Sequence, residues 1–247
     1  MAPRDEIIAF ADELLDIGSF RDYGPMGMQV VGAGEVTKVA CAVSASRELF
    51  VRAGATGAQL VVVHHGLLWD REPRVIDARM KGRLRALFDA DLTLAAYHLA
   101  LDAHPEIGNN VLLARKLGLT VYRSFAAIGV GGGFADPTTV PGLVVLVRRA
   151  ADREPLVFAD GPERIERAAV VTGGGARYLV DAAAEGYDVL ITGEADEPTM
   201  MTARELGINF VAAGHYATER LGVQALAGRI GERFDLEWEF VELENPV

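Results

Sequence analysis

Two adjacent histidines, His64 and His65, close the apolar run Val61–Val63 and are followed by Gly66. A buried strand rarely ends in two imidazoles for packing reasons, whereas the carboxyl ends of strands are where α/β sheets bind ligands. Imidazole is a common ligand for zinc, iron, nickel and copper. The pair therefore predicts a metal site, provided that the rest of the chain supplies further ligands.

An internal repeat duplicates the surroundings of this pair. Residues 38–65 align without gaps with residues 167–194, and both segments read as strand, small-residue turn, helix, glycine and strand. Further on, residues 94–98 align with residues 211–215 once one connection is shortened. Two copies indicate a duplicated domain rather than a solenoid. Because any two strand–helix–strand units look alike at this level, the repeat gains its weight from the side chains that follow it.

Each copy ends in a histidine with a carboxylate four residues later, His98 with Asp102 and His215 with Glu219. If a helix begins at or before His215, that spacing puts the second pair on one helix face. A mixed set of imidazoles and carboxylates is larger than one tetrahedral zinc needs, and paired ions serve hydrolases. If the two halves pack with these strand ends facing each other, the residues converge on one cleft, where a carboxylate could bridge two divalent ions. The converging residues are His64, His65, His98, Asp102, His215 and Glu219.

Other residues have less direct interpretations. Glu194 aligns with His65, and it either orients a ligand and handles a proton or caps a helix N-terminus as an acid. Trp69 either lines the cleft or simply packs. His104 lies outside the repeat and is expected to be a loop residue. Cys41 falls inside a strand, where a thiol is typically inert.

The alternation of strand and helix patterns predicts an α/β fold with mostly parallel sheets. We expect two similar, pseudo-symmetric α/β halves, residues 1–125 and 126–247, with the glycine-rich run Gly129–Gly133 at the boundary. That run lacks the lysine and the following helix of a phosphate-binding loop. The clearest patterns predict helices at 5–16, 47–55, 80–88 and 110–117, and strands at 28–32, 39–43, 92–97 and up to His65.

Composition narrows the function classes. Of 247 residues, 50% are hydrophobic and 24% charged, which is typical of a soluble globular protein. The formal net charge of −11 disfavours nucleic acid as a partner. The single cysteine excludes an intrachain disulfide and a cysteine-based zinc site. No signal peptide or membrane-length apolar run is present, so we expect a cytoplasmic protein without membrane segments.

The motifs also resemble those of a known family. In chain order they are His64–Trp69, His98–His104, Gly108–Asn110, Thr192–Glu194 and Gly214–Glu219. Over essentially its whole length the chain resembles the Nif-three-like dinuclear metal-centre proteins, also called GTP cyclohydrolase I type 2 homologs. Its length is that of the short bacterial form, which has no inserted central domain.

This resemblance implies two α/β halves with a two-metal cleft between them, and a ring-shaped homohexamer whose metal sites face the interior. It implies a set of five metal ligands, among which Glu219 is the bridging residue, while His98 is a weaker candidate. The implied ligands are His64, His65, Asp102, His215 and Glu219. The stretches Gly24–Val30 and Ala45–Ser46 depart from the family pattern, which affects the expected substrate more than the expected metal binding.

Two functions compete. In the first, the protein is a metal-dependent hydrolase: a metal-bound hydroxide attacks a nucleotide base ring, as in a GTP cyclohydrolase, or a phosphoester, and Glu194 or His98 moves protons. The ions would be Zn, Fe, Mn or Ni and the substrate a small molecule. In the second, a ring assembly binds metal for a regulatory purpose without turnover. A third possibility, a ring around DNA, is disfavoured by the charge.

Overall fold

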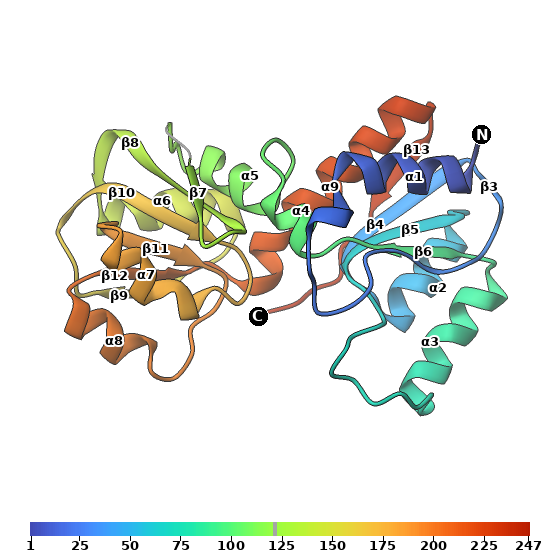
Figure 1. Ribbon diagram of the computed structural model, residues 1–247, viewed down its shortest axis with the longest axis horizontal. Coiled ribbons are helices and arrows are strands. Elements are labelled where there is room, and N and C mark those ends of the chain that lie inside the picture. Colours follow the sequence, from blue (N-terminus) through green and yellow to red (C-terminus); the bar gives the residue numbers. More distant parts are fainter. Residues whose placement is uncertain (121–122) are drawn as a thin grey trace. The chain divides into compact units, whose positions relative to one another are not determined.

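The computed structural model describes residues 1–120 and 123–247, which form two compact units (Figure 1). The first unit contains Met1–Leu101 and Gly222–Glu244, and the second contains Asp102–Leu221 and Asn245–Val247. The chain passes between them within helix α4 (Leu99–Ala103), within helix α9 (His215–Phe234) and again between Glu244 and Asn245. The predicted boundary lies between residues 125 and 126. The observed division differs because residues 102–125 belong to the second unit and residues 222–244 belong to the first.

The first unit is built on a five-stranded sheet in the order β13-β4-β5-β6-β2. The neighbouring pairs from β13 to β6 are parallel and β2 is antiparallel at the edge. The prediction of a mostly parallel sheet is therefore confirmed for this unit. The strands are β2 (Gly27–Val30), β4 (Lys38–Ser44), β5 (Leu60–His65), β6 (Thr93–Ala96) and β13 (Glu237–Phe240), with a small pair β1 (Ala2–Pro3) and β3 (Glu35–Val36) beside them.

Helices cover both faces of this sheet. In Figure 1, α1 (Arg4–Leu14) lies on the opposite side from α2 (Arg47–Ala55) and α3 (Ala78–Asp89). Ser46 caps α2 by accepting a hydrogen bond from the backbone of Leu49, a preferred role for serine, so the helix predicted at 47–55 begins as expected. Alternate strand residues pack against α2 and α3 to form a single core cluster.

The second unit has a six-stranded sheet in the order β7-β8-β10-β11-β12-β9. Only its central strands β10, β11 and β12 are parallel to one another, and the flanking pairings are antiparallel, so this sheet is mixed rather than mostly parallel. The strands are β7 (Arg123–Phe125), β8 (Gly129–Thr139), β9 (Leu156–Ala159), β10 (Arg164–Val171), β11 (Val189–Thr192) and β12 (Asn209–Ala212).

Two helix layers enclose this sheet, because alternate residues of the central strands face opposite sides. Val170 and Ile191 pack with α5 and α6, whereas Val171 and Leu190 pack with α7 and α8. The helices are α5 (Asn109–Lys116), α6 (Val140–Ala151), α7 (Leu179–Ala184) and α8 (Thr199–Leu206), with a short 3₁₀ turn at Ala176–Tyr178. A second 3₁₀ turn, Ile17–Ser19, lies in the first unit.

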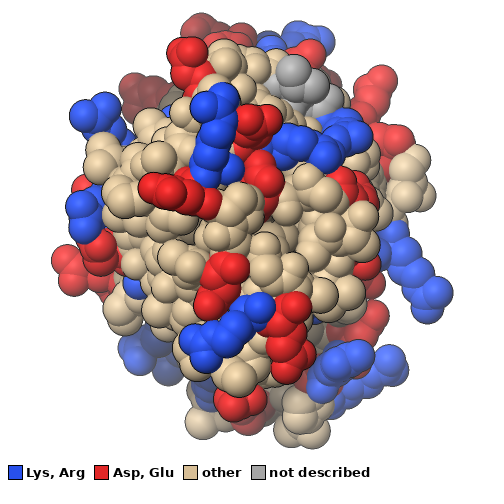
Figure 2. All heavy atoms as spheres, turned by 90° about the vertical axis from the view of Figure 1, so that its left-hand side faces the viewer, with Lys and Arg blue, Asp and Glu red and all other residues tan. Residues whose placement is uncertain are grey.

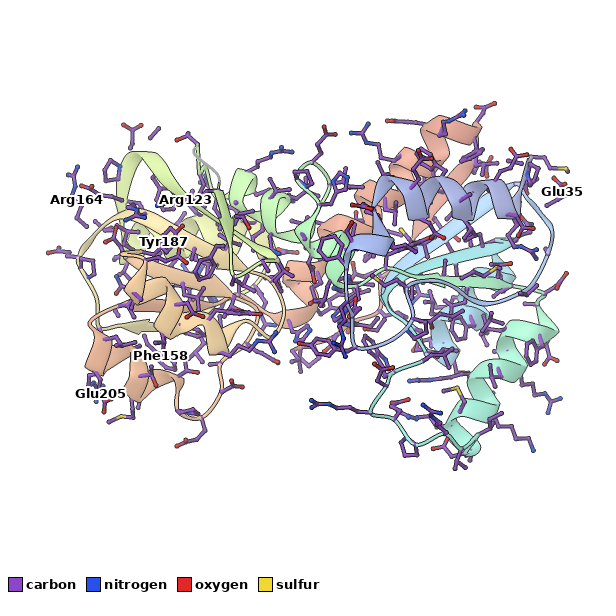
Figure 3. The ribbon with its side chains drawn as sticks, viewed as in Figure 1. Glu35, Arg123, Phe158, Arg164, Tyr187 and Glu205 are labelled. Atoms are coloured by element: carbon purple, nitrogen blue, oxygen red, sulfur yellow. The ribbon has the colours of Figure 1, made fainter. Side chains whose placement is uncertain are left out.

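The glycine run Gly129–Gly133 is part of strand β8, not a boundary between domains, so that expectation is wrong. A methyl group on Gly131 would lie 1.9 Å from the hydroxyl of Tyr187, so glycine permits the tyrosine to lie against the strand. Arg123 donates a hydrogen bond to the same hydroxyl at 3.1 Å (Figure 3). The glycines thus serve close packing inside the second unit.

Strand register in each sheet tests the repeat alignment. The β4–β5 ladder and the β10–β11 ladder have the same register when residues 38–65 are matched with residues 167–194. In the next ladder Leu94 lies opposite Val61 and Phe210 lies opposite Leu190, so Leu94 corresponds to Phe210. The sequence alignment places Leu94 one residue further on, and this second part of it is wrong by one position.

Candidate metal centre

His64 stands near the end of β5 and is fully buried. Its Nδ1 lies 2.9 Å from the backbone carbonyl oxygen of Tyr97. A carbonyl can only accept, so Nδ1 carries the proton and Nε2 carries the lone pair that binds metals. The fold therefore fixes His64 in a tautomer suited to metal ligation through Nε2.

His65, the next residue, is half-buried and lies opposite Ser44 of β4 in the sheet. Its Nδ1 is 3.0 Å from the Ser44 hydroxyl, which can donate or accept and so leaves the tautomer open. Gly66 follows the strand. A methyl group there would lie 2.4 Å from the side-chain oxygen of Gln29, so glycine is required at this position. That same oxygen accepts a hydrogen bond from the backbone of Leu67 at 2.8 Å, which fixes the turn after the histidines.

His98 follows β6 and is held by a carboxylate that the sequence reasoning missed. Its Nδ1 donates to Oδ1 of Asp22 at 2.7 Å, and Oδ2 of Asp22 accepts from the backbone of Leu99 at 2.8 Å. Burial raises the pKa of Asp22, but the hydrogen bond and charge of His98, with the backbone donors, outweigh burial and lower it. Asp22 is thus a carboxylate that fixes the orientation of an imidazole.

The three imidazoles of the first unit converge. One ring nitrogen from each of His64, His65 and His98 lies within 4.8 Å of the others. The edge of Trp69 packs on His98, with ring centroids 5.2 Å apart, and Trp69, His64 and His98 line a cavity of about 10 Å³. Trp69 thus lines the site, and the cavity is sized for one water-like species.

The second unit places His215 at the start of α9, directly after β12. Gly214 makes this turn with a φ of +99°, a conformation that L side chains rarely adopt. Nε2 of His215 lies 3.2 Å from Oε2 of Glu219 one helical turn later, as the spacing predicts. Glu219 is buried, so its charge is protected from solvent screening.

His215 also contacts Glu194 through its other ring nitrogen. Nδ1 of His215 lies 3.3 Å from Oε1 of Glu194, so the imidazole bridges two carboxylates. The hydrogen bond to Glu219 is the main reason that the pKa of His215 rises from 6.5 to about 9; Glu194 adds to this and burial opposes it. Glu194 therefore contacts Nδ1 of this imidazole and does not lie at a helix N-terminus.

Asp102 is buried in α4 of the second unit. Its Oδ1 accepts a hydrogen bond from Nδ2 of Asn109 at 2.8 Å and lies 3.4 Å from the hydroxyl of Thr172. Asn110 binds the backbone carbonyl of Asp102 at 3.1 Å and accepts from the backbone of Thr172 at 2.7 Å. Asn109 thus orients the carboxylate, and Asn110 connects the backbone of Asp102 to that of Thr172.

The loop Thr172–Gly175 after β10 is the main part of the site that the sequence reasoning missed. Gly173 has a φ of +65°, and a methyl group there would lie 2.1 Å from Oε1 of Glu219 and 3.2 Å from Nε2 of His215. Its backbone N–H donates to the hydroxyl of Thr218 at 3.1 Å. The glycine run that shapes the site is therefore this one, and its position directly after a strand was the available signal.

Three remaining sequence interpretations can be checked. His104 is a loop residue, as expected, and its Nδ1 accepts hydrogen bonds from the backbone of Glu106 and Ile107 at 3.1 and 3.2 Å. Cys41 is buried in β4, and burial, with the charge of Glu239, raises the pKa of its thiol to about 12. By strand register His98 corresponds to Gly214 and not to His215, so the two His-x-x-x-acid motifs are offset by one residue.

Helix composition and the distribution of surface charge describe the exterior of the protein. Among the residues that the structure describes, none of the helices combines the length and apolar character needed to cross a membrane. On the face shown in Figure 2, Lys and Arg side chains are interspersed with Asp and Glu. A mixed face of this kind lacks the broad positive area that tracks a phosphate backbone.

Comparison with known proteins gives matches over the whole chain. The chain is 42% identical over 246 residues to the GTP cyclohydrolase 1 type 2 homolog of Pseudomonas aeruginosa, covering 98% of this chain and 97% of that protein. It is 41% identical over 245 residues to the protein of the same name from Escherichia coli K12, covering 98% of each.

Comparison with solved structures also gives matches over the whole chain. The fold is similar to that of protein ybgI, described as of unknown function, with a TM-score of 0.96, 39% identity and complete coverage of both chains. It is also similar to TTHA1606 from Thermus thermophilus, with a TM-score of 0.94, 34% identity and complete coverage. A sequence model of the family described as Duf34/NIF3 (NGG1p interacting factor 3) matches residues 2–246. The resemblance seen in the motifs is thus confirmed, and the chain belongs to the Duf34/NIF3 family.

Proposed function

We propose that this protein binds two divalent metal ions and uses them as a metal-dependent hydrolase. The ligands are His64, His65, Asp102, His215 and Glu219. The observation that carries the proposal is the convergence of three imidazole nitrogens within 4.8 Å in the first unit, one of them from a histidine whose tautomer is fixed for ligation.

The donor set supports a pair of ions. The first unit supplies only imidazoles, and the second supplies the carboxylates of Asp102 and Glu219 with the imidazole of His215. Neither set alone offers enough ligands for two ions, whereas the five together do. A mixed nitrogen and oxygen set suits Zn, Fe, Mn or Ni, and a carboxylate such as Glu219 is the group able to bridge two ions.

The two ions would supply Lewis acidity and activate a water molecule for attack. Residues of this chain would then position and move protons. Glu194, next to Nδ1 of His215, can orient that imidazole and accept a proton. His98, held at Nδ1 by Asp22, presents Nε2 for proton transfer, and the ring of Trp69 packs against this imidazole.

The relatives' shared name, GTP cyclohydrolase 1 type 2 homolog, supports a nucleotide base ring as the substrate, and a phosphoester is the second choice. The ring-shaped homohexamer implied by the family motifs is part of the same proposal. Light scattering coupled to size-exclusion chromatography measures it: a mass of six chains is expected, and a monomer would contradict this part.

Metal content tests the proposal directly. Elemental analysis of the purified protein should give two divalent ions per chain, and His65→Ala and Glu219→Ala should each lower it. If each substitution removes both ions, the two units share one dinuclear centre; if each removes one, the ions bind separately. His104→Ala is the control, because this histidine is not among the proposed ligands and its Nδ1 accepts hydrogen bonds from its own loop backbone. Wild-type metal content in both test variants would contradict the proposal.

Activity is tested by incubating the metal-loaded protein with a panel of nucleotides that includes GTP. Release of formate or phosphate that disappears with a chelator supports the hydrolase. If metal binds stoichiometrically but no nucleotide is consumed, the second function, a metal-binding or regulatory ring without turnover, is favoured.

A further inference from the structure

A groove runs between α2 and α3 on the first unit, and none of the proposed metal ligands lines it. It has a volume of about 660 Å³. Its lining residues recur every three or four positions along both helices, from 47 to 55 on α2 and from 78 to 90 across α3. This spacing means that the groove follows the helix axes, for about 18 Å along α3.

The floor of the groove is apolar and built from small side chains. Gly54, Ala55, Gly82 and Ala86 leave the two helix backbones close to the surface. Val51 stands among them with 55% of its surface exposed. Small residues at such positions allow a third helix to approach closely, since interaxial distance depends on the side chains at the contact.

Positive side chains line both walls. Arg47 projects from α2, and Lys81 and Arg85 project from successive turns of α3. Within the described part of the chain, the side chains of Arg47 and Lys81 have no ion-pair partner, and Arg85 has an exposed pair with Asp89 at 3.4 Å.

This charge contrasts with that of the whole protein. The groove lining contains three Lys or Arg and one acidic residue, Asp89, in a chain whose net charge is −11. An acidic protein that gathers cations beside an exposed apolar floor presents a surface complementary to an acidic, partly apolar partner.

We infer that this groove is a docking site for an acidic amphipathic helix from a partner protein. The apolar face of that helix covers Val51 and the small residues, and its flanking Glu or Asp side chains pair with Arg47, Lys81 and Arg85. This is helix-in-groove recognition, in which anchors at i, i+3, i+4 and i+7 provide affinity and charges select the partner. The inference does not depend on metal binding or on hydrolysis.

The test uses the full-length protein and two synthetic 18-residue helical peptides. One carries leucines on one face with flanking glutamates, and the other has every glutamate replaced by lysine. Fluorescence anisotropy should show that the glutamate peptide binds and that added salt weakens this binding. The lysine peptide should bind at least about tenfold more weakly than the glutamate peptide.

Two variants test the groove itself. Gly82→Leu fills the floor, because a Cβ there meets only the Cδ of Arg47 at an ordinary 3.7 Å. It also replaces a helix-interior glycine, so the melting temperature should be kept or raised. The triple variant R47E/K81E/R85E reverses the walls. Both variants should bind the glutamate peptide about tenfold or more weakly.

A matched triple variant, R71E/R74E/R79E, changes the net charge equally at positions outside the groove lining and should bind like wild type. The inference is overturned if neither peptide binds, if both bind alike, or if the two triple variants weaken binding equally. It is also overturned if Gly82→Leu lowers the native mass in light scattering, since a second copy of the chain would then be the occupant.

Discussion

Asp22 accepts a hydrogen bond from Nδ1 of His98 over 2.7 Å, although 76 residues separate them in the chain. The carboxylate also accepts two backbone hydrogen bonds, from Leu99 at 2.8 Å and Tyr23 at 2.6 Å. A loop residue thus connects the glycine-rich segment before β2 to the turn after β6. Because the group that makes these hydrogen bonds is a carboxylate, their contribution to stability depends on pH.

Asp22→Asn should lower the free energy of unfolding of the metal-free protein at pH 7 by about 1.5–3 kcal/mol, the usual contribution of a hydrogen bond to a charged group. Because the folded-state pKa of Asp22 is lowered, its stabilisation is present above the ordinary aspartate pKa and lost as pH falls through the folded value. Urea titrations at pH 7 and pH 3 check this. The difference from wild type should shrink at pH 3, and the exposed Asp70→Asn should show little effect at either pH.

Glu219→Gln should lower the pKa of His215 from about 9 toward its ordinary 6.5 in the metal-free protein. Protonated His215 is favoured in the folded state, so its stabilisation is full below about pH 6.5 and is lost as pH rises through about 9. An NMR titration of the imidazole measures the pKa. Glu194→Gln should lower it by less, and an equal effect of the two variants would contradict the assigned order of the two carboxylates.

Gly173→Ala should damage the site as well as the backbone. Its positive φ of +65° strains any L residue, and the added methyl group also meets Glu219 at 2.1 Å. Gly118→Ala is the matched control, because Gly118 has a φ of +83° with no atom within 4 Å of the added methyl. Both should lose about 1–3 kcal/mol of stability, but only Gly173→Ala should shift the pKa of His215. Equal pKa values in the two variants would exclude the contact.

Cys41 should not react with iodoacetamide at pH 8 in the native protein. Its thiol is buried, and burial raises its pKa to about 12, so little reactive thiolate is present. Mass spectrometry after timed alkylation should show modification only in unfolding concentrations of urea. As a control, Ser19→Cys in a Cys41→Ala background should react at once, because position 19 is exposed. Rapid native modification of Cys41 would contradict the burial.

Individual helices and strands were predictable where the local signals in the sequence agreed. The helix Arg47–Ala55 has the predicted bounds because a serine cap and an apolar stripe agree. The strand ending at His65 follows from a run of β-branched residues. Histidine and carboxylate spacing was enough to single out six candidate residues, because few residue types perform metal chemistry and this chain has only five histidines. The narrower set of five ligands came from the resemblance to the family.

Contacts across long separations were not predictable. Asp22 lies in a loop without periodicity, so nothing in the sequence connects it to His98. The sequence alignment matches His98 with His215. Strand register depends on backbone pairing instead, and it matches His98 with Gly214. The run at Gly129–Gly133 resembles a linker in the sequence because the tyrosine that packs on it is more than fifty residues away.

The order in which the two sheets can be completed follows from the first unit, because its strands come from two separate parts of the chain. Its sheet includes β13 (Glu237–Phe240), which pairs in parallel with β4 (Lys38–Ser44). The strands that the structure describes in the second unit lie between residues 123 and 212. During translation, which proceeds from the N-terminus at about 5–20 residues per second, the second unit therefore has its complete sheet before the first. The unit whose first strands are made earlier is therefore the later one to have its complete sheet, because the outer edge of β4 has no strand partner until β13 has been made.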